Sequence, residues 1–186
     1  MTQEREIELI ERIVRGEKAL YAEIVRRYQV GVSQLCYRLV GDRLETKEVT
    51  QRVFVELYTA LPRFRFESRL STFIYRITVN VVLDMLKQES RMMPLEQDWL
   101  PEEGHRNGEE QMERTEQERR LRRAIGMLHP EQRTALVLAT FNDFTYNEVA
   151  EVMGITMSKV EALIYRAKQN LRNIMLKSEE SNKENK

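Results

Sequence analysis

Arginine and aromatic side chains alternate within one short segment of the chain, "LPRFRFESRLSTFIYR". The residues concerned are Arg63, Arg65, Arg69 and Arg76 together with Phe64, Phe66, Phe73 and Tyr75. Flat rings beside positive charges are typical of surfaces that capture single-stranded nucleic acid, because the rings stack on bases and the arginines attract phosphates. Aromatic residues are also common in hydrophobic cores, and the residues alone favour that interpretation. Both remain open at this point.

Polar residues continue along the helix expected after this segment. Arg76, Asn80 and Lys87 follow one another at steps of four and seven, which places them on one helix face. Asn80 has apolar neighbours in the sequence, and a buried amide without a partner costs about 1–3 kcal/mol. We therefore expect Asn80 either to be hydrogen-bonded within the fold or to bind a base edge.

A second candidate site lies in "TYNEVAEVMGITMSKVEALIYRAK". Thr145 and Glu148 have the spacing of a capping box, which predicts the start of a helix. Ala150 is small enough for a close helix crossing, and Gly154 permits the positive φ of a sharp turn. With Val160 six residues later, this spacing predicts a helix-turn-helix; an ordinary helical hairpin is the alternative. Three apolar residues would complete its core: Val149, Ile155 and Ile164.

The second helix of this motif has a face that could read DNA. A helix turns by about 100° per residue, so its inward side is formed by Val160, Ile164, Ala167 and Leu171. The opposite side is formed by Ser158, Ala162, Tyr165, Arg166 and Gln169, with Lys159 at its edge. The basic residues could contact phosphates, and the polar ones could form hydrogen bonds with base edges. Ala162 and Tyr165 could make apolar contacts with thymine methyl groups. Glu161 and Leu163 are expected on the flanks. A helix face that only contacts solvent is the alternative.

Charge is unevenly distributed along the chain, although its net value is zero. Residues 96–118 hold nine acidic and two basic residues, whereas residues 62–93 hold six basic and three acidic ones. The stretch "RRLRR" follows the acidic segment directly. A neutral chain with this distribution can still present basic surfaces to nucleic acid.

Composition predicts an all-α protein. The 186 residues include only seven Gly and four Pro, and apolar positions recur with a helical period. The single cysteine, Cys36, suits a reducing compartment, and the charged N-terminus "MTQEREIELIERIV" does not resemble a signal peptide, so we expect a cytoplasmic protein. His105 and His129 lie in no catalytic or metal-binding pattern. We therefore expect no enzymatic activity, cofactor or metal.

The pattern divides the chain into four parts. The pattern over residues 1–90 predicts a helical domain, with Ser71 as the N-cap of its last helix. Residues 91–116 predict a flexible acidic linker. Residues 117–177 predict a second helical domain, and residues 178–186 a disordered tail.

The two candidate sites, in this order, resemble those of bacterial RNA polymerase sigma factors of the extracytoplasmic-function group of the sigma-70 family. The segment "EVTQRVFVELYTALPRFRFESRLSTFIYRITVNVVLDMLK" is similar to region 2 of that family. The segment "AIGMLHPEQRTALVLATFNDFTYNEVAEVMGITMSKVEALIYRAKQNLR" is similar to region 4. The resemblance implies that the protein binds core RNA polymerase and promoter DNA, and that an anti-sigma factor, often membrane-anchored in this group, regulates it.

The resemblance also assigns roles to residues. It implies polymerase contacts by Glu48, Gln51, Arg52 and Phe54. It implies binding of the promoter −10 element by Arg63, Phe64, Arg65, Phe66, Glu67, Ser68, Tyr75, Arg76, Asn80 and Lys87. It implies reading of the −35 element by Ser158, Lys159, Ala162, Tyr165, Arg166 and Gln169.

Several positions depart from the usual family pattern. Arg52 replaces a residue that is usually acidic, Phe66 a small one that is often Gly, and Phe73 a common Trp. Glu161 and Leu163 replace residues that are usually basic. Losing two phosphate contacts would reduce the salt dependence of DNA binding by about two in log–log slope.

A dimeric helix-turn-helix regulator with an N-terminal helical sensing domain is the alternative function. Such a regulator would bind palindromic duplex DNA without polymerase.

Overall fold

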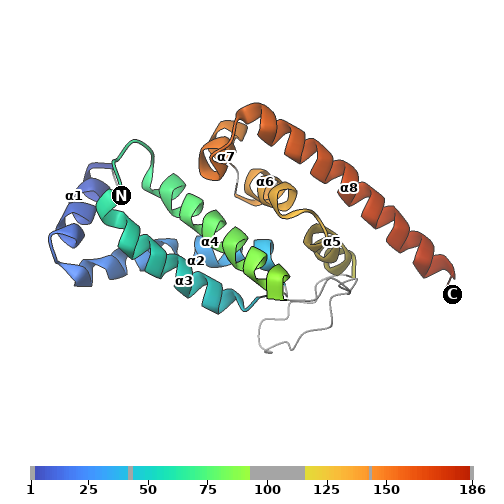
Figure 1. Cartoon of the computed structure of the whole chain (residues 1–186), viewed down its shortest axis with the longest axis horizontal. Helices are drawn as coiled ribbons and strands as arrows, with labels where there is room; N and C mark the ends of the chain where they lie inside the picture. Colours follow the sequence, from blue (N-terminus) through green and yellow to red (C-terminus); the bar gives the residue numbers. More distant parts are fainter. Residues whose placement is uncertain (1–2, 42–43, 93–115, 143, 185–186) are drawn as a thin grey trace.

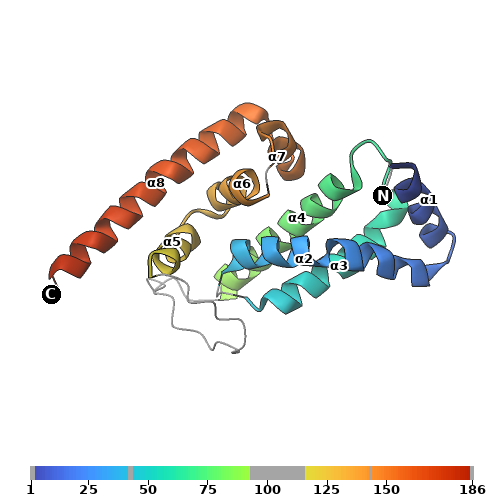
Figure 2. The same cartoon turned by 180° about the vertical axis from the view of Figure 1, so that it is seen from behind.

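The computed structural model describes residues 3–41, 44–92, 116–142 and 144–184, and these residues contain helices and no strands. The helices form two groups that lie side by side (Figure 1). Figure 2 shows the same arrangement from behind, with the C-terminal part of α8 extending away from the other helices. The expected all-α architecture is confirmed.

The N-terminal group consists of four α-helices and two short 3-10 turns. The elements are α1 (Gln3–Val14), η1 (Lys18–Leu20), α2 (Tyr21–Val40), α3 (Thr46–Ala60), η2 (Leu61–Arg63) and α4 (Leu70–Met92). Val49, Val53, Leu57 and Leu61 recur every four residues and are all buried, as a helix with one apolar face requires. This face of α3 packs against α2 and α4 and forms the centre of the group.

The C-terminal group contains the predicted helix-turn-helix. Its helices are α5 (Glu116–Gly126), α6 (Pro130–Phe141), α7 (Tyr146–Met153) and α8 (Met157–Glu184). The Thr145 hydroxyl accepts a hydrogen bond from the Glu148 N–H, and the Glu148 carboxylate accepts one from the Thr145 N–H, so the capping box is confirmed. Gly154 has φ 65°, the left-handed conformation that the turn was expected to need. Val160 is fully buried, and α7 and α8 pack together around it.

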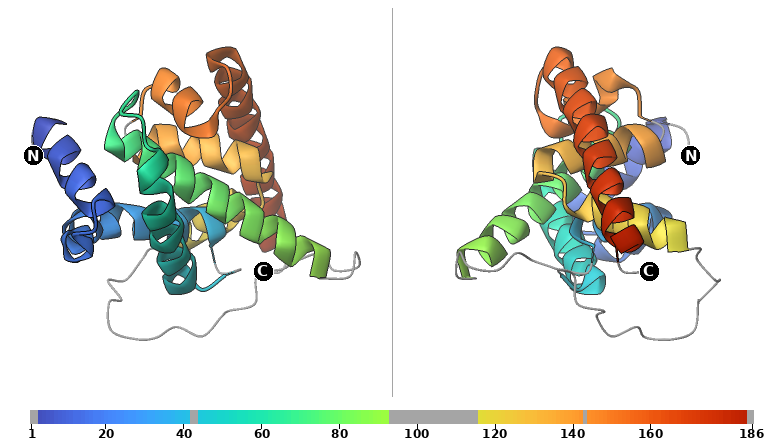
Figure 3. Two further views of the ribbon diagram at one scale, coloured as in Figure 1. Left: turned by 60° about the vertical axis from the view of Figure 1, so that its left-hand side comes forward. Right: turned by 90° about the vertical axis from the view of Figure 1, so that its right-hand side faces the viewer.

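The two groups share one continuous core. Helix α6 lies between α8 and the N-terminal group in the left-hand view of Figure 3; it packs against both α8 and α2, while α7 contacts α4. Arg133 of α6 is buried, and its Nη1 donates a hydrogen bond to the Leu39 carbonyl of α2 at 2.6 Å. The residues described therefore form a packed pair of helix groups.

The structure differs from two expectations from the sequence and does not describe most of a third segment. Helix α4 begins at Leu70, so Ser71 lies inside the helix and the predicted cap is wrong by two residues. Helix α8 continues to Glu184, so the prediction of a disordered tail from residue 178 is wrong up to that point. Most of the predicted linker, residues 93–115, lies outside the described residues. None of the described helices is long and apolar enough to cross a membrane.

The capping box makes a testable contribution to stability. Thr145→Ala removes the hydroxyl that satisfies the Glu148 N–H, and we expect a loss of about 1 kcal/mol in the free energy of unfolding, measured by urea denaturation. Hydrogen bonds from Thr145 lower the pKa of Glu148. A carboxyl group with a lowered pKa stabilises the fold at pH values above its ordinary value. The difference in unfolding free energy between Thr145→Ala and the unaltered protein should therefore shrink as the pH falls below the ordinary glutamate value of 4.5.

Thr140→Ala is the matched control, because Thr140 is exposed in α6. We expect its effect to stay within about 0.5 kcal/mol. Equal losses for the two variants would contradict the capping role of Thr145.

Candidate nucleic-acid interface

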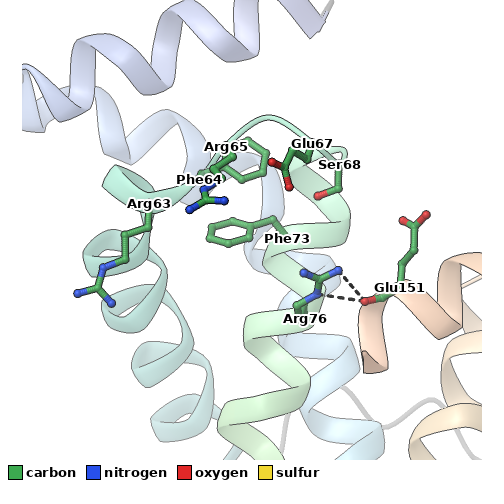
Figure 4. A pocket seen from close by; sticks show the side chains of 8 residues that line it. All are labelled: Arg63, Phe64, Arg65, Glu67, Ser68, Phe73, Arg76 and Glu151. Atoms are coloured by element: carbon green, nitrogen blue, oxygen red, sulfur yellow. Dashed lines mark hydrogen bonds between the residues drawn. The ribbon is translucent and has the colours of Figure 1, made fainter. Parts of the chain in front are cut away.

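A pocket lies where the loop after α3 meets the first turns of α4 (Figure 4). Its volume is about 310 Å³. The lining residues are Arg63, Phe64, Arg65, Glu67, Ser68, Phe73, Arg76 and Glu151. All but Glu151 belong to the arginine-rich and aromatic segment recognised in the sequence. Glu151 comes from α7 in the C-terminal group.

Three phenylalanines pack together at this pocket. The ring centroids of Phe64 and Phe73 lie 4.7 Å apart at an interplanar angle of 32°, and Phe66 meets Phe64 edge-on at 4.9 Å. All three are half-buried against the core, while Phe64 and Phe73 also line the pocket. The two interpretations of these aromatics are therefore compatible, since one cluster supports the loop and also presents rings to the pocket.

Phe66 holds an unusual backbone conformation. Its φ is 58°, and no other residue except glycine has a positive φ in the described part of the chain. A side chain in this left-handed region costs about 1–2 kcal/mol, which glycine avoids. This geometry gives a physical reason why the resemblance places a small residue, often Gly, at this position.

Arg76 lies at the boundary between the two helix groups. Its Nε and Nη2 donate hydrogen bonds to the Glu151 carbonyl at 3.0 and 2.8 Å (Figure 4). Arg69 lies nearby, with its Nη1 3.8 Å from the Glu148 carboxylate. Two of the arginines that the sequence assigns to nucleic acid are thus engaged by α7, whereas Arg63 and Arg65 are exposed.

Besides Phe66, three residues predicted for this site lie outside the pocket lining. Tyr75 packs against Phe144 with ring centroids 5.3 Å apart, and burial raises its pKa. Its hydroxyl lies 2.7 Å from where a Cβ on Gly31 would be, so glycine in α2 makes room for it. Asn80 is exposed, which removes the expected need for a buried partner. Lys87 is exposed and lies 3.8 Å from the Asp84 carboxylate.

Helix α8 presents most of its predicted reading face to solvent. Tyr165 is 66% exposed, and Ala162 is half-buried. Four polar residues on this face are exposed: Ser158, Lys159, Arg166 and Gln169. Glu161 is exposed on the flank as predicted, but Leu163 is only 6% exposed and packs in the core. The expectation that Leu163 lies beside DNA is therefore wrong.

The predicted polymerase-binding helix, α3, also has an exposed face. Glu48, Gln51 and Arg52 lie on it. Phe54 is 9% exposed and belongs to the core, so it is not part of this surface, contrary to the sequence prediction. Val55 is 63% exposed on the same side as Glu48 and Gln51, because it follows them by seven and four residues.

The sequence matches two family profiles. Residues 24–92 match Sigma-70 region 2, and residues 118–171 match Sigma-70, region 4. The chain belongs to the sigma-70 family of RNA polymerase sigma factors. The protein is thus a transcription initiation factor of the kind that binds core RNA polymerase and promoter DNA.

Relatives of this sigma factor extend over nearly the whole chain. It is 32% identical to RNA polymerase sigma-H factor of Pseudomonas aeruginosa over 91% of this chain and 93% of the relative. It is 31% identical to ECF RNA polymerase sigma-E factor of Haemophilus influenzae over 89% and 92%. These relatives place it in the extracytoplasmic-function group.

Two solved structures share its fold. CnrH in complex with the cytosolic domain of CnrY has a TM-score of 0.62 and 19% identity, covering 90% of this chain and 94% of CnrH. The sigma factor RpoE of Bartonella quintana, in complex with the anti-sigma factor NepR, has a TM-score of 0.67 and 15% identity, covering 83% and 96%.

Sequence reasoning did not identify Val55 and Glu151 as parts of the surfaces of this sigma factor. Val55 could have been found by extending the helical spacing of Glu48 and Gln51. The participation of Glu151 in the pocket had no local signal, because it depends on how α7 packs against α4.

The strain at Phe66 can be measured by substitution. Phe66→Val and Phe66→Gly both remove the ring, but valine tolerates a positive φ poorly. We expect the valine variant to be less stable by about 1 kcal/mol in urea denaturation.

Tyr165 provides the control, since it is an exposed aromatic residue within helix α8. In a helix the order should reverse, with Tyr165→Gly less stable than Tyr165→Val. If glycine is also the less stable choice at residue 66, the left-handed conformation of Phe66 is not strained.

Proposed function

We propose that this sigma factor captures an unstacked base of the −10 element in the pocket beside α4 and reads the −35 element with α8. It directs polymerase to promoters in the cytoplasm and has no catalytic activity of its own. The observation that carries this proposal is the pocket itself. It joins aromatic rings and arginines within the part of the chain that matches region 2.

The lining of the pocket suits an extruded base. Phe64 and Phe73 offer ring faces for stacking, and Arg63 and Arg65 are exposed beside them, where a phosphate backbone would run. Glu67 and Ser68 supply acceptors and a hydroxyl for base edges. Phe66 acts behind the pocket by supporting Phe64, and Asn80 and Lys87 extend the polar face along α4.

The −35 interaction depends on the exposed face of α8. Arg166 and Lys159 supply positive charge, and Lys159 also lies 3.7 Å from the Glu131 carboxylate. Glu161 places a negative charge on the flank of this face, so we expect weaker phosphate contact there. Leu163 is buried, so Glu161 is the one exposed position of the two at which a usually basic residue is replaced. We therefore expect the log–log salt dependence of DNA binding to be lower than the usual value by about one, instead of by about two.

Docking on polymerase is assigned to the exposed face of α3. This face combines Glu48, Gln51 and Arg52 with the apolar side chain of Val55. An apolar residue surrounded by polar ones is typical of the centre and rim of a protein interface. Arg52 stands where the family usually has an acidic residue, so it would make this surface more positive and favour a more acidic partner surface.

Regulation by an anti-sigma factor is part of the proposal. The two solved structures of the same fold are complexes with the cytosolic domain of CnrY and with NepR. By extension, we infer that a protein of this kind binds the present sigma factor and keeps it from polymerase.

Reconstitution with core polymerase tests the proposed function. The sigma factor is mixed with core enzyme and genomic DNA, and transcript starts are mapped. We expect starts that share sequence near −10 and −35. A complex that produces no promoter-specific transcript would contradict the proposal.

Polymerase binding through α3 has its own test. Val55→Asp places a charge at the centre of the proposed docking face, and we expect the Kd for core enzyme to rise about tenfold, equivalent to about 1.4 kcal/mol. The measurement is a binding titration with labelled sigma factor.

Val30→Asp is the matched control, because Val30 is 61% exposed but lies on α2. Its Kd should remain within about twofold of the unaltered protein. Equal weakening by both substitutions would exclude α3 as the specific docking face.

A further inference from the structure

Helix α8 carries a carboxylate in the part of the helix that would enter a DNA groove. The helix begins at Met157, and the Thr156 hydroxyl accepts a hydrogen bond from the Lys159 N–H at 3.3 Å. Glu161 therefore lies within the first two turns. In a helix-turn-helix the N-terminal residues of the reading helix contact base edges in the major groove. Glu161 is thus near enough to this end of α8 to meet a base edge.

Burial of Leu163 fixes the direction in which Glu161 faces. Two residues correspond to about 200° of rotation, so Glu161 and Leu163 lie almost opposite each other around the helix axis. Leu163 is 6% exposed and packs in the core, whereas Glu161 is exposed and faces away from it. Ser158 lies three residues before Glu161 and Tyr165 four residues after it, so all three share one exposed side of α8. The Glu161 carboxylate therefore adjoins the proposed reading face.

The Glu161 carboxylate forms no ion pair or hydrogen bond with the described part of the chain. Lys159 differs in this respect, because its Nζ lies 3.7 Å from the Glu131 carboxylate. An ionised carboxylate accepts hydrogen bonds and donates none, and the negative phosphates of DNA repel it. Its favourable partner in a major groove is therefore a hydrogen-bond donor on a base edge.

Cytosine is the base whose major-groove edge suits a carboxylate. It presents the N4 amino group, which is a donor, without an acceptor beside it. Guanine presents the acceptors N7 and O6, and thymine presents the acceptor O4 and a methyl group. Adenine has a donor at N6, but the acceptor N7 lies next to it and would repel the second carboxylate oxygen. A bond from N4–H to a carboxylate is also charge-assisted, so it is stronger than a neutral hydrogen bond.

We propose that Glu161 reads a cytosine of the −35 element by accepting a hydrogen bond from its N4 amino group. This inference rests on the proposed reading of the −35 element by α8. At the other three bases the carboxylate loses water and gains no well-placed donor, which makes binding unfavourable there. Its charge also weakens attraction to phosphates at every sequence. Glu161 thus lowers general affinity for DNA and increases the preference for the correct site.

Base selection by the reconstituted polymerase tests this role. Core enzyme with the full-length sigma factor binds a pool of DNA duplexes that contain a randomised segment, and the bound duplexes are sequenced. We expect a cytosine at one position of the upstream shared element. Glu161→Gln should replace this preference by adenine, because glutamine binds N6 and N7 of adenine together. Glutamate and glutamine have similar helix propensities and residue 161 is exposed, so the variant should keep the fold.

Binding titrations then measure the preference on the most enriched duplex. Replacing its C·G pair at this position by T·A should raise the Kd of the unaltered protein about tenfold. Glu161→Gln should bind both duplexes within about twofold, since glutamine favours neither base. N4-methylcytosine keeps its pairing hydrogen but has a methyl group in place of the groove-facing one, so it should weaken binding as thymine does. Glu8→Gln is the matched control, because Glu8 is exposed on α1, and it should keep the tenfold preference.

Arg166→Ala separates this inference from the proposed function. If an upstream element is selected and Arg166→Ala weakens its binding, α8 reads DNA. The inference about Glu161 is then overturned if the element contains no preferred cytosine, or if Glu161→Gln leaves the base preference unchanged. If no upstream element is selected and Arg166→Ala has no effect on binding, α8 does not read the −35 element, and that part of the proposed function fails together with the inference.

Discussion

Arg76 donates two hydrogen bonds to the end of α7, and it also lines the pocket that we propose binds DNA. Its position follows from α4, which carries it beside the pocket, and from the packing of α7 on the same helix. Helix α7 meets this region at two points, since Glu151 accepts the Arg76 hydrogen bonds and Glu148 lies beside the exposed Arg69. The packing of the two helix groups therefore determines which residues line the proposed −10 pocket.

The two helix groups meet at surfaces of opposite charge, although the net charge of the chain is zero. The pocket loop is rich in arginine, whereas the adjoining surface of α7 carries Glu148 and Glu151. Hydrogen bonds from Thr145 lower the pKa of Glu148, so this residue is ionised near neutral pH while it stabilises its own helix. One carboxylate thus serves both as part of a helix cap and as a weak, solvent-screened partner for Arg69.

The helices and the helix-turn-helix could be predicted because their signals are local. The spacing of Val49, Val53 and Leu57 defines a buried face, and Thr145 with Gly154 defines the ends of α7. The pocket-lining segment was recognisable from its interleaved residue types. The inward positions of Phe54 and Leu163 were missed because exposure depends on which helices pack nearby. Likewise, Tyr75 binds in a space left by Gly31, forty-four residues away, and the buried Arg133 has its partner in another helix group. No local pattern records such pairings.

The distance between the two helix groups tests most directly the packing that shapes the proposed −10 pocket. Dyes can be attached through Gln29→Cys on α2 and Asn173→Cys on α8, both exposed positions. Cys36 will not interfere, because burial raises its pKa to about 11 and it is inaccessible. Single-molecule energy transfer is then recorded for the free sigma factor. We predict one short distance, because the two groups share one continuous core. A long or widely distributed distance would show that the groups do not pack together, which would contradict this account.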